Sequence, residues 1–472
     1  MRLLKWDKPV GACPASFYAV GDSSEFNQNM EVLFKMTNTQ RKEIPRYVFP
    51  AVGGLFMTYL YNVVDGIFVG QGVGAAALGA VNIGVPFITS VVAIAAMFPM
   101  GGATVVAIRM GRGDKKGANQ AFMTSVVLTL LVSAILTVVG MVFAGPIVDL
   151  SGGAQLSREM RDMAVDYLFY YSAFSIPMLM STCLSTFVRN DGSPALSFLG
   201  MAVGAVANIF LDWLFIFPFQ MGVVGAAVAS GLGQISAVLV LLTHFLRRRG
   251  SLRLGGFHLS APLMGKICKR GVPEAVSQLN TPVTAFCYNL VLAHLVGDMG
   301  VSTFSVLSFI YSLANAILSG VAQGLQPLWG NHYGQKDTGG LKSLLRDGIT
   351  INAALSVLVY GFLFLLAAPV ICIFNQEPAL VEAASQALPL FALSFIPMAL
   401  NLIFTAYFYS TKRTVQADVI AVSRGIVVKA ACIFLMPALL GEDVIWLAPL
   451  AAECITLVLA LVLEKKSNLL YV

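Results

Sequence analysis

Residues 66–108 read GIFVGQGVGAAALGAVNIGVPFITSVVAIAAMFPMGGATVVAI, a stretch without a single charged side chain. Apolar runs of 18 or more residues are typical of transmembrane helices. The whole chain follows this pattern, because 57% of its 472 residues are hydrophobic and only 11% are charged, against about 25% in soluble proteins. The sequence therefore predicts an all-α protein of the lipid bilayer. It excludes a disordered chain, a disulfide-stabilised secreted domain and a nucleic-acid-binding protein.

Twelve apolar segments are long enough to cross a bilayer, and a helix is the form in which one segment satisfies its own backbone there. With the amino terminus in the cytoplasm, the inner segments carry 26 Lys and Arg residues and the outer loops carry only Arg158 and Arg161. Basic loops concentrate on the cytoplasmic side, so we expect a multi-pass protein of the cell (inner) membrane with both termini in the cytoplasm. The twelve predicted spans are 44–69, 79–108, 120–145, 163–188, 194–217, 223–246, 270–296, 302–330, 347–373, 384–409, 416–440 and 444–463.

The two halves of the chain repeat each other weakly. A shift of 223 residues places Asp114 on Asp337, and a shift of 220 places the triplet Ile-Pro-Met of residues 176–178 on the same triplet at 396–398. Six spans in each half return the chain to the starting side, so the sequence predicts two parallel six-helix repeats, a plan found in transporters. The expected parts are a cytoplasmic amino-terminal segment 1–43, a first lobe 44–246, a cytoplasmic linker 247–269, a second lobe 270–463 and a cytoplasmic tail 464–472.

Charged side chains inside a membrane are costly and commonly functional. Asp65 and Asp212 lie about 28 Å and about 25 Å along the first and fifth helices, since an α-helix rises 1.5 Å per residue. Tyr61 and Asn208 each precede one of these acids by one helical turn, and Ser230 reaches a similar depth in the sixth helix. Together they form a candidate site for a proton or a sodium ion. The alternative is that each Asp merely lies at the outer interface.

Four further charges lie within the predicted spans. Lys429 and Glu453 come to similar depth in neighbouring helices, so we expect a structural ion pair, with a role in substrate binding as the alternative. Removing one partner should destabilise the protein, and removing both should restore part of the loss. Arg424 lies in the same region. Glu274 follows Pro273, which leaves two interpretations open: the chemistry of a helix start, or an acid facing a cavity.

Motifs for other chemistry are missing from the sequence. It has no GxxxxGK[ST] loop for ATP, its four histidines are scattered, and its seven cysteines form no CxxC pair. We therefore expect no metal, no cofactor and no catalytic residues, and a protein that is not an enzyme.

Several short motifs together resemble the multidrug and toxic compound extrusion (MATE) family over about residues 40–464. This resemblance implies a V-shaped pair of lobes that exports cationic or amphipathic drugs in exchange for protons or sodium ions. The motifs are Pro50, DGIFVG at 65–70, GRGD at 111–114 with Gly117 and Ala118, NIFLD at 208–212, GAA at 225–227 and Gly233-Gln234.

The resemblance also implies roles for individual residues. The cation-site positions of the first lobe fall on Tyr61, Asp65, Asn208, Asp212 and Ser230, and Pro50 falls on the proline at which the first helix bends. Glu274 matches an acid of the sodium-coupled branch. The predicted span 384–409 lacks the acid that accompanies it in that branch, so coupling through the first lobe is favoured.

Alternatives remain at this point. A major facilitator transporter has the same repeat plan, but the loop at residues 109–114 fits its motif poorly. A lipid-linked saccharide flippase of the same broader superfamily would line its cavity with several basic residues, and a membrane-embedded enzyme would need a nucleophile, metal or cofactor motif. We expect a monomer whose partners are small-molecule drugs or organic cations and the lipid bilayer.

Overall fold

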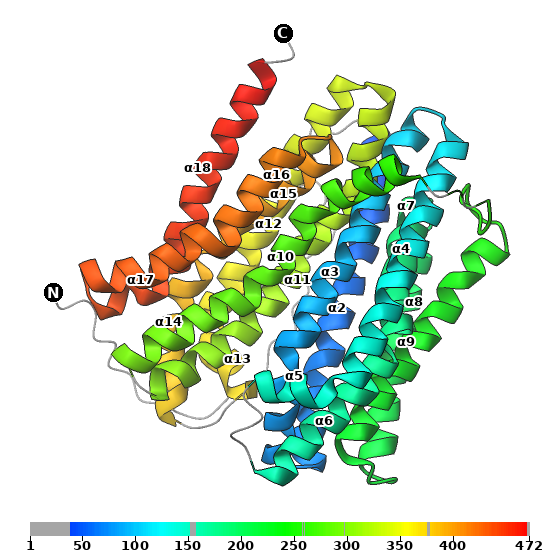
Figure 1. Ribbon diagram of the computed structural model, residues 1–472. Helices are drawn as coiled ribbons and strands as arrows, with labels where there is room; N and C mark the ends of the chain where they lie inside the picture. Colours follow the sequence, from blue (N-terminus) through cyan, green and yellow to red (C-terminus); the bar gives the residue numbers. More distant parts are fainter. Residues whose placement is uncertain are drawn as a thin grey trace, which may run out of the picture.

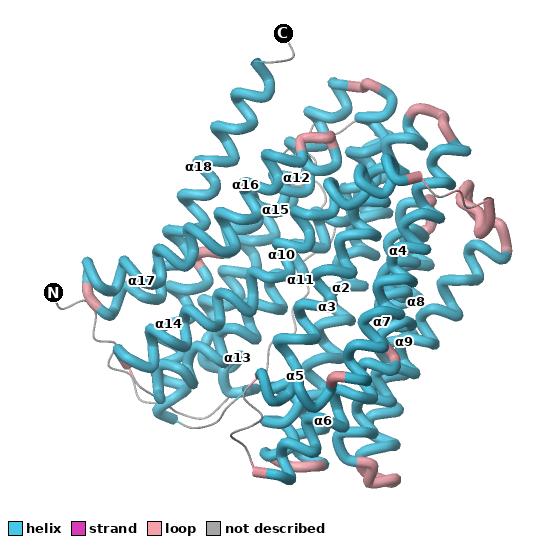
Figure 2. The backbone as a smooth tube through the Cα atoms, in the orientation of Figure 1, coloured by secondary structure: helices cyan, strands magenta, loops and turns pink. Residues whose placement is uncertain are grey.

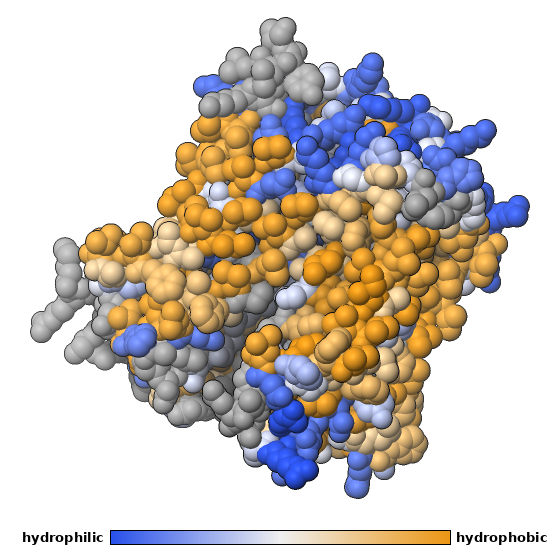
Figure 3. Space-filling model, viewed as in Figure 1, coloured by the Kyte–Doolittle hydropathy of each residue, from blue (hydrophilic) through white to orange (hydrophobic). Residues whose placement is uncertain are grey.

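The computed structural model describes residues 38–151, 157–256, 258, 260–296, 298–374 and 378–469, and the regular structure in these ranges is helical (Figure 2). Among the described residues, nine helices are long and apolar enough to span a bilayer, and two pairs of helices qualify as bent spans. An apolar band covers the middle of the face shown in Figure 3, while hydrophilic side chains gather toward its two ends. The chain is therefore a multi-pass membrane protein.

The helices form two bundles, which lie on opposite sides of Figure 1 and meet along α2, α3, α10 and α11. The amino-terminal bundle contains α2 (Asn38–Gly72), α3 (Ala75–Gly111), α4 (Lys115–Val142), α5 (Ala144–Leu150), α6 (Arg158–Ala173), α7 (Ser175–Asn190), α8 (Pro194–Ile216) and α9 (Gly222–Leu246). The carboxyl-terminal bundle contains α10 (Ala261–Leu295), α11 (Asp298–Gln335), α12 (Thr338–Leu365), α13 (Ala367–Phe374), α14 (Pro378–Ala392), α15 (Phe395–Ser410), α16 (Thr414–Val422), the π-turn η2 (Ser423–Val427), α17 (Val428–Leu440), the 3₁₀ turn η3 (Glu442–Leu447) and α18 (Ala448–Leu469).

Two of the predicted spans are bent at equivalent places. Helices α6 and α7 meet at 48°, and α14 and α15 meet at 43°. In both pairs the break lies just before the repeated Ile-Pro-Met triplet, whose prolines are Pro177 and Pro397. Proline has no N–H to donate to the carbonyl four residues earlier, and its ring clashes with that carbonyl. The repeated proline therefore accounts for both bends.

The turns near residues 111–114, 190–193, 247–256, 335–338 and 411–413 lie together, and we call this side the basic end because most of the Lys and Arg residues lie there. Two of the turns have the same local design. Asp114 Oδ1 accepts a hydrogen bond from Gly117 N at 2.8 Å, and Asp337 Oδ1 accepts one from Gly340 N at 2.9 Å. The Gly340 N–H and the adjacent His332 ring also hold the pKa of Asp337 below its usual range.

Glycines allow the two bundles to meet closely toward the basic end. A methyl group added at Gly111 would collide with the Asn331 carbonyl oxygen, and one added at Gly334 would collide with the Ile108 carbonyl oxygen. Small residues let the backbones of membrane helices approach in this way. We call these contacts the glycine seam; its residues are Gly101, Gly111, Gly320, Gly324 and Gly334. The seam holds the basic end closed in this structure.

Enlarging one glycine of the seam should open the basic end. Gly111→Val overpacks the contact with Asn331, which commonly costs about 1–3 kcal/mol. Spin labels at the exposed residues Lys116 and Lys342, one in each bundle, should therefore report longer distances in pulsed electron resonance. Gly265→Val is the control, because a side chain there meets nothing within 4 Å. Equal distances in both variants would contradict the role of the seam.

Candidate functional site

The five residues of the predicted cation site lie on three helices that pack together. Tyr61 and Asp65 lie on α2, Asn208 and Asp212 on α8, and Ser230 on α9. Asp212 and Asn208 are fully buried, and Asn208 Nδ2 donates a hydrogen bond to Ser230 Oγ at 3.3 Å. The structure therefore places the predicted residues in one region of the amino-terminal bundle.

Small residues let α8 and α9 approach closely enough for this contact. A methyl group added at Gly204 would lie 3.1 Å from the Gly233 carbonyl oxygen, and one added at Gly233 would lie 2.8 Å from Asn208 Cβ. Because residues four apart share one face of a helix, the face of α8 that carries Gly204 also directs Asn208 and Asp212 toward α9.

Oxygen atoms without hydrogen-bond partners are the main chemical feature of this region. Both carboxylate oxygens of Asp212, Asp65 Oδ1 and Asn208 Oδ1 are buried and unpaired. The negative charges of Asp65 and Asp212 act on each other. A buried carboxylate is costly unless it is protonated or paired, and oxygen atoms are the preferred ligands of hard cations. This group of oxygen atoms therefore fits a proton or a small cation.

The structure adds polar residues that the sequence reasoning missed. Gln234 Nε2 donates to Tyr61 Oη at 3.3 Å, and Gln234 Oε1 accepts from Ser181 Oγ at 2.5 Å. Tyr167 of α6 lies near both acids and Tyr171 lies near Asp65; the two ring centroids are 5.8 Å apart. Spacing could have indicated these residues, because Gln234 lies one turn after Ser230 and the two tyrosines are one turn apart.

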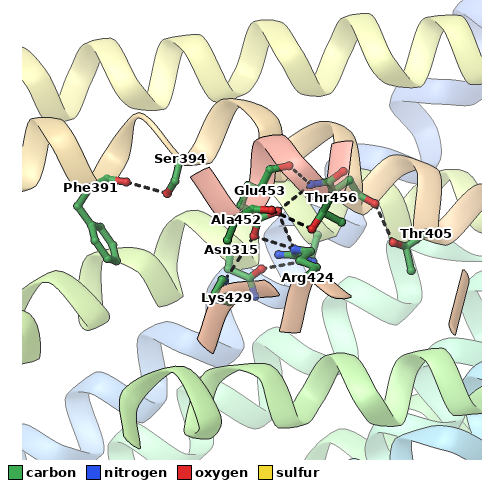
Figure 4. A network of polar contacts seen from close by, with 11 residues as sticks. Asn315, Phe391, Ser394, Thr405, Arg424, Lys429, Ala452, Glu453 and Thr456 are labelled. Atoms are coloured by element: carbon green, nitrogen blue, oxygen red, sulfur yellow. Dashed lines mark hydrogen bonds and ion pairs between the residues drawn. The ribbon is translucent and has the colours of Figure 1, made fainter. Parts of the chain in front are cut away.

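A second buried cluster lies in the carboxyl-terminal bundle (Figure 4). Arg424 Nε lies 3.0 Å and 3.2 Å from the two carboxylate oxygens of Glu453, and Lys429 Nζ lies 3.4 Å from Glu453 Oε1. Asn401 Nδ2 donates to Glu453 Oε2 at 2.8 Å. The structure thus places the predicted partners Lys429 and Glu453 together, and it adds Arg424 to form a triad.

The π-turn η2 explains how two bases on one helix reach the same acid. In a regular α-helix, residues five apart point about 140° away from each other, since each residue turns the helix by about 100°. A π-turn contains more residues per turn, so residues five apart come back toward the same side. Arg424 lies in η2, and Lys429 follows directly after it. The π-turn therefore directs the side chains of Arg424 and Lys429 toward Glu453.

The triad changes the expectation for a simple ion pair. Two bases and one acid leave a net positive charge, so removal of Lys429 still leaves Arg424 paired with Glu453. Removal of Lys429 and Glu453 together leaves Arg424 as an unpartnered buried charge. The double change should therefore not restore stability, contrary to what the sequence predicted.

Neutral variants of the triad should consequently differ in how much stability they lose. We expect Glu453→Gln to be the most damaging, by about 3–5 kcal/mol, because a broken buried pair leaves uncompensated charge. Lys429→Met should be close to wild type. Thermal unfolding of the detergent-solubilised protein measures the order, with Val427→Met on the exposed side of the helix as a control. Equal losses for Glu453→Gln and Lys429→Met would contradict the triad.

Glu274 does not lie at a helix start, so that interpretation of the sequence is wrong. Helix α10 begins at Ala261, because the residues between the basic linker and Pro273 are also helical. Glu274 Oε1 accepts a hydrogen bond from Gln278 Nε2 at 3.0 Å, one turn further along α10. Its side chain faces a cavity between the bundles.

This cavity has a volume of about 100 Å³ and lies between α2, α10, α11 and α15. Drug-sized ligands occupy pockets of about 300–1,000 Å³, so the arrangement seen here accommodates only small groups. Pro50 lies in α2 on the amino-terminal side of the cavity, and α2 continues through it as one helix. The polar residues that line the cavity include Tyr59, Glu274, Asn315, Gln323, Thr405 and Arg424.

Comparison with known proteins gives consistent matches over most of the chain. The MatE family model matches residues 50–214 and 273–434. The multidrug export protein MepA of Staphylococcus aureus (strain bovine RF122 / ET3-1) is 21% identical over 425 residues, which cover 89% of this chain and 93% of that protein.

Solved structures share the fold. The crystal structure of MATE in complex with MaD3S has a TM-score of 0.85 at 23% identity, and the outward-facing conformation of a multidrug resistance MATE family transporter of the MOP superfamily has a TM-score of 0.84 at 24% identity. Each match covers 90% of this chain and 95% of the other. The arrangement of the helices described above is therefore that of these structures.

Proposed function

The chain belongs to the multidrug and toxic compound extrusion family of efflux transporters, and from this we propose that it is a secondary active antiporter. It exports cationic or amphipathic compounds in exchange for protons or sodium ions. The observation that carries the proposal is the group of unpaired buried oxygens on Asp65, Asp212 and Asn208. Neither a metal cofactor nor a catalytic step is part of this function.

The coupling follows from charge. Two buried carboxylates repel each other, and binding of a proton or Na⁺ relieves that repulsion. The bound and empty sites therefore favour different packing of α2, α8 and α9, with Pro50 as a point where α2 bends. An ion can drive the release of a compound only through such a difference between two states.

We also propose the finer architecture. Helix α10 is a further span, the seventh in chain order, and brings the eleven candidate spans to twelve. The two bundles are parallel six-helix repeats that form the two lobes of a V. The equivalent bends before Pro177 and Pro397 support this repeat. The basic end faces the cytoplasm of the cell, in the inner membrane. A flippase fits the cavity less well, since among its described lining residues Arg424 is the one base.

Neutralising Asp65 or Asp212 should uncouple transport from the ion gradient. Asp65→Asn and Asp212→Asn should each insert normally into the membrane and abolish efflux of a cationic dye from proteoliposomes under an imposed pH or sodium gradient. Asn208→Ala and Ser230→Ala should reduce efflux, and Glu274→Gln should retain an ion dependence. Asp162→Asn, at an exposed position of α6, is the matched control. Full gradient-driven efflux by the double Asn variant would refute the coupling site.

Orientation is tested by thiol labelling of intact cells. In a cysteine-free variant, single cysteines at the exposed residues Lys116 and Leu254 of the basic end should resist an impermeant thiol reagent. A cysteine at the exposed Glu159 near the opposite end should react and serves as the positive control. The reverse labelling pattern would overturn the proposed topology.

A further inference from the structure

Arg189 is a buried charge that lies one residue beyond the predicted span 163–188. It lies one residue before the end of α7, and only 6% of the residue is exposed. Its Nη2 atom donates to Gln323 Oε1 of α11 at 3.3 Å, so it bridges the two bundles. Its Nε atom is buried without a hydrogen-bond partner. One contact to a neutral amide therefore leaves this guanidinium incompletely paired.

Glu274 is the acid whose charge acts on Arg189. The charges of the two groups act on each other, and both also interact with Tyr409 of α15. Within the described residues they form no ion pair closer than 4.0 Å. Glu274, Gln323 and Tyr409 all line the cavity between the bundles. Arg189 is thus a cation of the opposite bundle that lies directly behind the cavity wall, in contact with the lining residue Gln323.

We propose that Arg189 is a tethered cation that competes with the transported organic cation for Glu274. While the glycine seam is closed, Arg189 compensates the Glu274 carboxylate from across the interface. When the basic end opens, Arg189 withdraws with α7, and Glu274 is left to bind a cation arriving from that side. Closure then returns Arg189 and lowers the affinity of the cavity for its cargo. The inference rests on the proposed function in one respect, namely that the cargo is cationic.

Electrostatics supports this exchange. A carboxylate in a site of low dielectric needs a positive partner, and a second cation in the same cavity is disfavoured by like-charge repulsion. One carboxylate therefore holds either the guanidinium or the cargo. Because Arg189 and Glu274 belong to different bundles, the choice depends on how the bundles are arranged, as transport requires.

Binding of radiolabelled tetraphenylphosphonium to the intact detergent-solubilised protein tests the competition. Arg189→Gln removes the competitor and should tighten binding about fivefold or more, at the lower end of the usual range for coupled sites. Arg189→Lys keeps the charge and should stay near wild type. Gln323→Ala removes the hydrogen bond across the bundles but keeps the guanidinium, so it should not reproduce the effect of Arg189→Gln.

A double-mutant comparison identifies Glu274 as the shared partner. Glu274→Gln should weaken binding, and Arg189→Gln should tighten it clearly less in that background than in wild type. If the neutral variants fail to fold, Arg189→His provides the same test in one protein, since its affinity should rise between pH 5.5 and 8 as the imidazole loses its proton. The affinity of wild type, measured in parallel, should change less over this pH range.

The outcomes separate this inference from the proposed function. Unchanged affinity in Arg189→Gln, or equal tightening by Gln323→Ala, would overturn the tethered cation and leave Arg189 as a structural contact. Loss of gradient-driven efflux in the Asp65 and Asp212 variants would still support the antiporter in that case. Failure of wild type to bind tetraphenylphosphonium would instead overturn the cationic cargo on which both depend.

Discussion

The structure of both bundles depends on how buried carboxylates are neutralised in a low-dielectric interior. In the amino-terminal bundle, Asp65 and Asp212 share one region, and Asp65 Oδ1 and both carboxylate oxygens of Asp212 are buried without a hydrogen-bond partner. Unpaired buried charge destabilises the packing of α2, α8 and α9 until a proton or a cation binds. In the carboxyl-terminal bundle, Glu453 is satisfied by Arg424, Lys429 and Asn401. The Asp65 and Asp212 region is thus sensitive to ions, whereas the Glu453 triad has its charges fixed.

Much of the helical architecture was predictable because the bilayer imposes it. The thickness of the hydrocarbon core determines the length of each apolar segment, so eleven predicted spans correspond to candidate membrane helices or bent pairs. Hydropathy does not register a break in direction, and segments 163–188 and 384–409 therefore looked continuous. The repeated prolines were visible, but their bends were not predicted. The start of α10 was misplaced because helical structure extends into a stretch that is rich in basic residues.

The candidate site was predictable only as far as single helices determine it. Spacing of four residues indicated that Asn208 accompanies Asp212 and that Tyr61 accompanies Asp65. Contacts between helices depend on rotation and bends that hydropathy does not encode, so Gln234 and Tyr167 were missed. The burial of Arg189 could not be predicted for the same reason: at the end of a span, charge alone does not distinguish a solvated loop residue from one that is turned into the interface.

The π-turn also has a consequence for the register of α17. A π-turn holds about one residue more than the α-helical segment that turns the chain through the same angle. One residue fewer between Ser423 and Val427 would therefore return the segment to α-helical geometry and leave the faces of α17 nearly unchanged. Lys429 would stay near Glu453, and Leu435 would keep its present exposure of 57%. The same deletion further along α17 would instead rotate the rest of the helix by about 100°. The π-turn is thus the place where this span can change its length without changing the faces of the helix.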